Sequence, residues 1–403
     1  MNMIAQKDRQ LGIMFGLAIG DAMGAPIEFT KSREPKDYIR SYMTGGFHNV
    51  SKGEFTDDTS MALAMAAAFI KAGGFDARLT MNNFLDWKNK GSYSPRGEMF
   101  DCGNTVLAAL RKYEKNSENP FTGDTSPDAA GNGGLMRLAP ALLAARNRTE
   151  AITFAKETTR LTHGAEEALF YSTLLASELW DSCPDQNHED KKLPVEIERS
   201  QVMSGGYVKE TYQAAWWAYQ TTNSFEECVY AAINRGFDAD TTGAVAGMIA
   251  GNMYGYKSIP KWMVNELQWN EYIADQAQKL IAIGGRETPR EELDSMWSSL
   301  NKIYAPEAGK VYSINGIQCF CISPLASYGG GSLPLWAVEG HSAQLTLRES
   351  MSGYIRGVCL SVSKNPAGFV FKPSSRGWPD QNYQREERFL TTDCIARYDV
   401  NWY

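Results

Sequence analysis

The sequence predicts a large all-helical domain followed by a smaller β-rich domain. From Arg9 to about Tyr304, runs of Ala, Leu and Met recur with helical spacing, and strand patterns are nearly absent. Beyond Ala305 the composition changes to short β-favouring runs, such as 358–362, separated by Gly and Pro. The length of 403 residues leaves room for two or three domains. We therefore expect a helical domain over residues 1–304 and a β-rich domain over residues 305–403.

The first predicted helix carries a glycine at every fourth position, and a second helix near residue 250 repeats this spacing. The two sets are Gly12, Gly16, Gly20 and Gly24, and Gly243, Gly247, Gly251 and Gly255. A spacing of four places each set on one helix face. Glycine inside a helix costs about 1 kcal/mol relative to alanine, so such a stripe indicates close approach of another backbone. We expect both helices to lie at the centre of the domain.

Further helices are predicted between these two, and a surface loop interrupts them. The helical runs cover 60–72, 104–114, 138–146, 164–180 and 211–220. The polar stretch 181–200 contains Pro184 and Pro194, which is typical of a loop between helices. We expect this loop to lie inside one domain rather than between two.

Composition excludes several classes of protein. The net charge of −7 argues against strong nonspecific binding to nucleic acid or anionic membranes. No stretch approaches the ~18 consecutive apolar residues of a membrane-spanning helix, and the N-terminus lacks a signal-peptide pattern. The seven cysteines are an odd number at scattered positions, which does not suit a disulfide framework. We expect a cytoplasmic protein with no membrane association.

Two acidic motifs, each directly before an apolar helix, predict a split metal site. They are Thr56-Asp57-Asp58-Thr59 and Asp238-Ala239-Asp240-Thr241. Asp and Thr are also the residues that N-capping selects, so capping alone explains either motif taken singly. Four carboxylates gathered in one place repel each other unless cations neutralise them. Carboxylate and hydroxyl oxygens suit hard divalent cations such as Mg²⁺ and Mn²⁺.

Four other features are candidates for the same site, although each is weak alone. Glu28 follows Pro26, which ends the first helix, so its side chain projects from a loop. The glycine-rich turn 131–137 suits a phosphate through its exposed backbone N–H groups. The turn 101–105 also opens a helix, and His163 stands at an expected helix start. Taken singly, the two turns are more often ordinary turns or caps, and the histidine is more often structural or merely exposed.

Taken in order, these pieces resemble the ADP-ribosylglycohydrolase family. The motifs are Gly20-Asp21-Ala22-Met23-Gly24 with Glu28, Thr56-Asp57-Asp58-Thr59, Gly131-Asn132-Gly133-Gly134 with Met136 and Arg137, Thr162-His163, and Asp238-Ala239-Asp240-Thr241-Thr242-Gly243. The resemblance extends from about residue 9 to 300. This family includes dinitrogenase-reductase-activating glycohydrolases and ADP-ribosylarginine hydrolases.

The resemblance implies a fold and a set of site residues. The fold is an all-α orthogonal bundle with two divalent cations, Mg²⁺ or Mn²⁺, at the bottom of an ADP-ribose cleft. The implied metal ligands are Thr56, Asp57, Asp58, Asp238, Asp240 and Thr241. The implied substrate-binding residues are Asp101, Gly103, Asn104, Thr105, Asn132, Gly133, Gly134, Met136, Arg137 and His163. Glycoside hydrolysis needs a base for the attacking water and an acid for the leaving group. Asp57 or Asp58 is our candidate for the base, with Glu28 as the competing carboxylate.

Two functions of different classes follow. The first is metal-dependent release of ADP-ribose from a modified protein, most simply from an arginine, although serine, a nucleobase or a free ADP-ribose derivative fits the same cleft. Loops 32–55 and 86–100 are expected to form the walls around the leaving group. The second is an immunity protein that occludes an ADP-ribosylating toxin through residues 305–403. A relative without catalysis would have lost the carboxylates, which this chain retains.

Overall fold

The computed structural model describes residues 6–181 and 197–285 in full, and the backbone of seven strands between residues 311 and 390. The chain divides into two compact units, Met1–Gly284 and Gly285–Tyr403. The predicted domain boundary at residue 304 lies outside the described residues, as does 182–196, most of the predicted loop.

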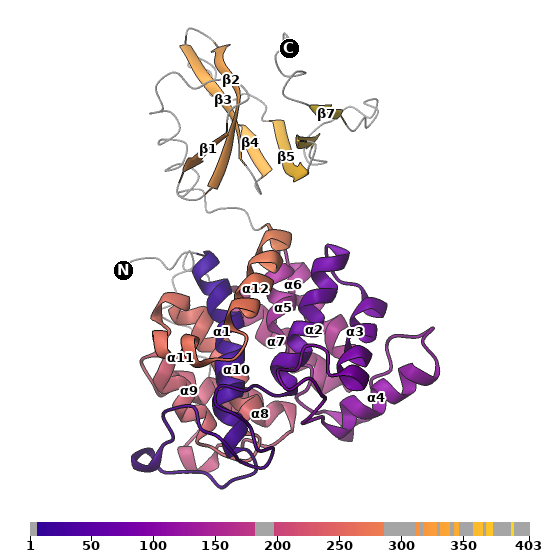
Figure 1. Ribbon diagram of the computed structural model, residues 1–403, viewed down its shortest axis with the longest axis vertical. Coiled ribbons are helices and arrows are strands. Elements are labelled where there is room, and N and C mark those ends of the chain that lie inside the picture. Colours follow the sequence, from indigo (N-terminus) through magenta and orange to yellow (C-terminus); the bar gives the residue numbers. More distant parts are fainter. Residues whose placement is uncertain are drawn as a thin grey trace. The chain divides into compact units, whose positions relative to one another are not determined.

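The first unit is helical throughout its described residues, as the sequence predicts (Figure 1). Its α-helices are α1 (Gln6–Gly24), α2 (Asp57–Ala72), α3 (Ala77–Lys90), α4 (Asn104–Lys115), α5 (Ala139–Ala144), α6 (Arg148–Arg160), α7 (Glu166–Asp181), α8 (Val208–Gln220), α9 (Phe225–Ile233), α10 (Ala239–Tyr254), α11 (Lys261–Glu266) and α12 (Asn270–Gly284). The short 3₁₀ turns are η1 (Ala25–Ile27), η2 (Pro35–Asp37), η3 (Pro127–Ala129), η4 (Arg199–Gln201) and η5 (Tyr256–Ser258).

Helices α1 and α10 run side by side through the middle of this unit (Figure 1). A Cβ built on Gly16 would lie 2.0 Å from the Gly247 carbonyl oxygen, and one on Gly20 would lie 1.9 Å from that of Gly243. No side chain fits at such separations, so the two backbones are in direct contact. Residue numbers fall along α1 as they rise along α10, so the helices are antiparallel. The predicted central position of both glycine-striped helices is therefore confirmed.

Gly255 differs from its predicted role as the last glycine of the second stripe. Its φ of 79° lies outside the helical region, and α10 ends one residue earlier. At the other end of the contact, Gly24 faces the Ala239 carbonyl instead. The contact therefore continues to the first residue of α10, which brings the end of α1 beside the two aspartates there.

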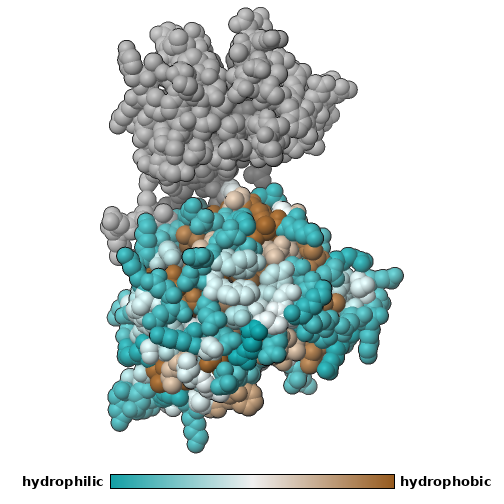
Figure 2. All heavy atoms as spheres, viewed as in Figure 1, coloured by the Kyte–Doolittle hydropathy of each residue, from teal (hydrophilic) through white to brown (hydrophobic). Residues whose placement is uncertain are grey.

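The surrounding helices begin and end at conventional signals. Asp76, Asn147 and Ser224 cap α3, α6 and α9 by accepting a hydrogen bond from the backbone N–H three residues later. Figure 2 shows one face of the helical unit, where hydrophilic residues predominate and hydrophobic ones are scattered among them. The apolar faces of these helices therefore point inward, toward α1 and α10.

One helix in the described part of the chain is long and apolar enough to cross a membrane. It is the segment 6–27, and 94% of its apolar window is buried inside the structure. Its apolar composition is accounted for by its central position against α10.

The second unit contains antiparallel strands in two sheets of order β1-β2-β3 and β4-β5-β6-β7. The strands are β1 (Val311–Ile314), β2 (Ile317–Tyr328), β3 (Gly331–Val338), β4 (Ser342–Leu345), β5 (Val358–Asn365), β6 (Gly368–Pro373) and β7 (Arg388–Leu390). Tight hairpins pair Ile314 with Ile317 and Tyr328 with Gly331. The strands fall where β structure is predicted, while the domain that they build, and its limits, stay a prediction.

A methyl group at the central contact is expected to destabilise the helical unit. Gly247→Ala places a Cβ 1.9 Å from the Gly16 carbonyl oxygen, so the helices must separate. The expected loss is about 3 kcal/mol or more of unfolding free energy, measured by urea denaturation. Gly74→Ala is the control, because a Cβ there meets nothing within 4 Å. Equal stability of both variants would contradict the close contact.

Candidate functional site

The acidic motifs meet at the end of α1. Asp57 and Asp58 open α2, while Asp238 and Asp240 stand at the start of α10. Because α10 runs antiparallel to α1, its first turn lies beside the end of α1 and the Glu28 that follows. All four aspartates and Glu28 take part in the groups of neighbouring carboxylates described below. The convergence that the sequence analysis assumed is present in the structure.

Helix capping does not explain the two acidic motifs. Thr56 and Asp238 occupy the N-cap positions of α2 and α10, yet neither side chain makes a capping hydrogen bond. The Thr59 N–H in the first turn of α2 instead donates to Asp21 Oδ2 of α1, at 2.9 Å. The carboxylates of the two motifs are therefore not used as helix caps and are available for another purpose.

Asp21 fixes the start of α2 from outside that helix. Its Oδ1 accepts from the Thr56 N–H at 2.9 Å and lies 3.0 Å from the Thr56 hydroxyl. Its Oδ2 accepts from the Thr59 N–H at 2.9 Å and from the Thr59 hydroxyl at 2.6 Å. A carboxylate has about four lone-pair positions, and these bonds use all of them. Asp21 is therefore a support of the site, and its side-chain oxygens reach the carboxylate cluster already bonded to the start of α2.

Several groups of carboxylates lie close enough to share a cation. In each of the triplets Asp21/Asp58/Asp240, Glu28/Asp238/Asp240 and Asp57/Asp101/Asp240, one ligand atom per residue lies within 4.8 Å of the others. Asp240 belongs to all three triplets. The site is thus organised around Asp240, with the carboxylates of α2 on one side and Glu28 and Asp238 on another.

Burial makes these charges unfavourable without a counterion. It raises the pKa of Glu28 to about 8 and that of Asp21 to about 6. Burial, reinforced by the neighbouring carboxylates, holds the pKa values of Asp57, Asp58 and Asp240 well above their usual range. The protein alone therefore does not stabilise the full set of charges.

Unsatisfied oxygens mark where a cation fits. In the described part of the chain, the carboxylate atoms Asp58 Oδ2, Asp101 Oδ2 and Asp240 Oδ1 are buried without a hydrogen-bond partner. The second oxygen of Asp58 is held by the Thr241 hydroxyl at 3.1 Å. Asp238 is held by Asn132 Nδ2 at 2.8 Å. Oriented carboxylates with free inward oxygens are the donor set that hard divalent cations take.

One histidine joins this acidic cluster from the loop between η2 and α2. His48 Nε2 lies 3.0 Å from Glu28 Oε2 and 3.3 Å from Asp101 Oδ1. These two hydrogen bonds raise the pKa of His48 to about 9, so the imidazole carries a positive charge at neutral pH. This positive charge faces Glu28 and Asp101 at the outer edge of the cluster.

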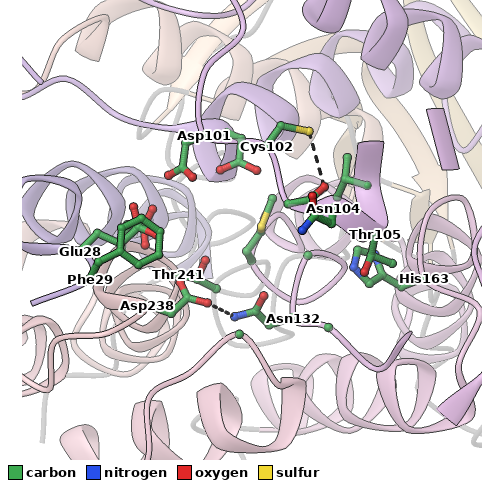
Figure 3. A pocket seen from close by; sticks show the side chains of 18 residues that line it. Glu28, Phe29, Asp101, Cys102, Asn104, Thr105, Asn132, His163, Asp238 and Thr241 are labelled. Carbon is green, nitrogen blue, oxygen red and sulfur yellow. Dashed lines mark hydrogen bonds between the residues drawn. The ribbon is translucent and has the colours of Figure 1, made fainter. Parts of the chain in front are cut away.

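The carboxylates form one half of a pocket of about 390 Å³ (Figure 3). We name the lining carboxylates the acidic half: Glu28, Asp57, Asp101, Asp238 and Asp240. We name the uncharged lining residues the neutral half: Asn104, Thr105, Gly131, Asn132, Gly133, Met136 and His163, with Asn132 bonded to Asp238 where the two halves meet. In Figure 3, Glu28 and Asp238 lie on one side of the cavity while Asn104, Thr105 and His163 lie on the other. A bound molecule therefore meets carboxylates at one end and uncharged donors at the other.

A buried relay fixes the hydrogen-bonding role of His163. Arg137 Nη2 donates to Thr162 Oγ1 at 2.5 Å, which leaves the Thr162 proton for His163 Nδ1, 2.9 Å away. Burial lowers the pKa of His163 to about 3, so the ring is neutral and its remaining proton is on Nε2. A Cβ on Gly133 would lie 2.5 Å from this ring, so the glycine loop leaves room for it.

Most predicted site residues line the pocket, but four do not. Thr56, Asp58, Gly134 and Arg137 are absent from its lining. Thr56 and Asp58 lie just beneath the pocket within the carboxylate cluster. Gly134 faces the Thr159 side chain. Arg137 was expected to contact substrate, but it is fully buried behind His163 and stacks over Phe84.

Sequence reasoning missed several contributors to the site, including Val106 and Gly206 of the lining, and Asp21, His48 and Phe29. Asp21 had a visible signal, a carboxylate inside an apolar helix, which burial alone does not favour. His48 had none, because its partners lie 20 and 53 positions away in the chain. Phe29 lines the pocket with a φ of 57°, a backbone conformation that composition does not reveal for phenylalanine.

Comparison with known proteins gives a consistent result. The family model of ADP-ribosylglycohydrolase matches residues 2–290. The chain is 33% identical to the ADP-ribosylarginine hydrolase Tri1 of Pseudomonas putida (strain GB-1), over 72% of this chain and 81% of the relative. It is 32% identical to the ADP-ribosyl-(dinitrogen reductase) glycohydrolase of Rhodospirillum rubrum, over 69% of this chain and 97% of the relative. A solved structure of an ADP-ribosylglycohydrolase-related protein complex superposes with a TM-score of 0.58 at 33% identity, covering 69% of this chain and 98% of the other.

Removing the shared carboxylate is expected to abolish the response to divalent cations. Mn²⁺ at 100 times its Kd should stabilise the wild type by about 2.7 kcal/mol, measured as a rise in Tm. Asp240→Asn should lose this rise, because Asp240 belongs to three carboxylate groups. In EDTA the variant should unfold no earlier than the wild type, because one repelling charge is gone. Asp37→Asn, on the exposed turn η2, is the control. A full Mn²⁺ response in Asp240→Asn would contradict the site.

Without divalent cations, stability is expected to fall as pH rises. The pKa of Glu28 is about 8 in the folded chain against 4.5 ordinarily, so folding favours the protonated form. The free energy of unfolding therefore falls between pH 4.5 and about 8, and the raised pKa of His48 acts in the same direction near pH 9. Urea denaturation in EDTA at pH 5 and pH 8 tests this. Equal or greater stability at pH 8 would show that these carboxylates are already neutralised.

Proposed function

The chain belongs to the ADP-ribosylglycohydrolase family, and from this premise we propose that it releases ADP-ribose from an arginine side chain of a modified protein. It is a glycohydrolase by its family and by its named relatives. The observation that carries the proposal is the division of one pocket into an acidic and a neutral half. The neutral half suits the nucleotide, while the acidic half suits the ribose that carries the bond to be broken.

We propose two divalent cations, Mg²⁺ or Mn²⁺, in the acidic half. The ligands proposed from sequence are Thr56, Asp57, Asp58, Asp238, Asp240 and Thr241. The unpartnered oxygens of Asp58 and Asp240 support this set, and the membership of Asp240 in several groups suits a carboxylate shared by two ions. When bound, such cations polarise ribose hydroxyls and lower the pKa of water. This chemistry suits attack on an anomeric carbon.

Two carboxylates of the chain are proposed to move the protons. Asp57 lines the pocket whereas its neighbour Asp58 does not, which supports Asp57 as the base that takes the proton of the attacking water. Glu28 also lines the pocket, and it lies outside the proposed ligand set, whereas the cations would hold Asp57 ionised; burial, which raises the pKa of Glu28 to about 8, therefore favours a protonated carboxyl at this position. That proton is available to the leaving group. Glu28 is therefore proposed as the acid, with His48 holding its Oε2 in place at 3.0 Å.

The neutral half is proposed to orient the nucleotide. His163 presents an uncharged Nε2–H to the pocket, which suits an acceptor such as a phosphate oxygen or a ring nitrogen. The residues proposed beside it are Asn104, Thr105, Asn132, Gly133 and Met136, all of which line the cavity. Arg137 serves this half indirectly, through Thr162, rather than by contact with the substrate.

The remaining expectations stay predictions. Binding of an ADP-ribosylating toxin through residues 305–403 is one of them, and the match to the family ends at residue 290. A cytoplasmic location is another; within the described residues, Cys102 and Cys228 are free thiols.

Loss of the two carboxylates at the start of α2 is expected to abolish hydrolysis. The double variant Asp57→Asn/Asp58→Asn keeps the side-chain volumes, and release of ADP-ribose should fall by a factor of about 10³ or more with the fold retained. The assay supplies Mg²⁺ or Mn²⁺ and defined arginine, serine and nucleobase conjugates of ADP-ribose. Asp37→Asn should remain active. Normal turnover by the double variant would rule out the mechanism, and preference for another conjugate would correct the linkage.

A further inference from the structure

Three phenylalanines expose their side chains around the acidic half of the pocket. Phe29, Phe47 and Phe237 are 60%, 74% and 52% exposed, and we name them the aromatic rim. Phe29 lines the pocket, and its ring lies 4.9 Å from that of Phe47 in an edge-to-face contact. Phe237 directly precedes Asp238, another lining residue. Large apolar side chains grouped at a pocket mouth indicate a surface that another molecule covers.

The backbone holds two of these residues in an unfavourable conformation. Phe29 and Phe237 have φ values of 57° and 54°, in the left-handed region that bulky residues seldom adopt. Reciprocal bonds maintain them: the Phe29 N–H donates to the Phe237 carbonyl at 2.6 Å, and the Phe237 N–H donates to the Thr30 carbonyl at 2.8 Å. Such strain persists only where the surrounding structure enforces it, and it is typical of functional sites.

The third phenylalanine stands on a short loop that is itself fixed. Gly45 and Val50 exchange two backbone hydrogen bonds of 2.8 Å, and a Cβ on Gly46 would lie 2.4 Å from the Pro26 carbonyl. His48 points inward to Glu28, and the preceding Phe47 is the most exposed of the three phenylalanines. The loop therefore holds His48 in the acidic cluster and the adjacent Phe47 ring at the surface.

We propose that the aromatic rim is the docking surface for the polypeptide on either side of the ADP-ribosylated side chain. This inference rests on the proposed function and extends it from the linkage to the protein that bears it. A modified side chain whose ribose reaches the acidic half brings its own backbone over the mouth, where the rim lies. Exposed aromatic rings are the side chains that contribute most to protein interfaces, and they pack against aliphatic and aromatic residues of the target.

The experiment compares an intact protein substrate with a small one. Release of ADP-ribose is measured from a protein mono-ADP-ribosylated on arginine and from free ADP-ribosyl arginine, with the wild type and two variants. Phe47→Ser removes the most exposed ring, and Phe237→Asn replaces the ring with a residue that tolerates the left-handed backbone. Phe170→Ser is the matched control, because Phe170 is 57% exposed on α7 and does not line the pocket.

The rim variants should lower kcat/KM on the protein substrate about tenfold, mainly through KM, and leave the small substrate within about twofold of the wild type. Equal losses on both substrates would assign the rim to ADP-ribose and overturn the proposal. Unchanged activity on both would also overturn it, and loss of a dimer in the same variants would then assign the rim to a second copy of the chain. A wild type inactive on both substrates would instead refute the proposed function, and this inference with it.

Discussion

Direct contact between the backbones of α1 and α10 brings the end of α1 beside the aspartates at the start of α10, and the site is built around this junction. Gly20 touches Gly243, and the next residue along α1 is Asp21. The same contact ends at Ala239, between Asp238 and Asp240. A side chain anywhere along this line would separate the helices by more than the spacing of the carboxylate groups tolerates. Asp21 then fixes the start of α2 relative to α1 through its bonds to Thr56 and Thr59. Three helices thus meet at one point, α1 and α10 by backbone contact and α2 through the Asp21 side chain.

The site is electrostatically incomplete as the chain alone builds it. Burial opposes ionisation of Asp57, Asp58 and Asp240, while the available positive charges stand at the edges: His48 at the mouth and Arg137 behind. Neither cation makes a described hydrogen bond to these three aspartates. An ion pair at the centre would have stabilised the fold but filled the space that a divalent cation needs. The unpartnered oxygens therefore lower the stability of the fold, and their use as cation ligands would explain why the chain retains them.

The sequence allowed the helical domain, its central glycine helices and most of the pocket lining to be predicted, because these depend on local patterns. Glycines at every fourth position indicate where two helices touch. An Asp directly before an apolar run indicates where a helix begins. What could not be predicted depends on the tertiary fold. His48 reaches Glu28 because its loop packs against the Pro26 carbonyl. Arg137 points inward because it donates to Thr162 and stacks over Phe84. Residue type alone does not distinguish a substrate-binding arginine from a buried one.

Phe29 and Phe237, whose backbones are left-handed, connect the proposed docking surface with the acidic half of the pocket. Phe29 follows Glu28, and Phe237 precedes Asp238, so the hydrogen bonds from the Phe29 N–H to the Phe237 carbonyl and from the Phe237 N–H to the Thr30 carbonyl hold the chain neighbours of two carboxylates side by side. The proposed docking surface and the acidic half of the pocket therefore share one stretch of backbone, in which each exposed ring is the direct chain neighbour of a lining carboxylate. Because the positive φ values belong to the backbone and the exposed area to the side chains, a substitution that tolerates the left-handed conformation removes a ring without displacing the adjacent carboxylate.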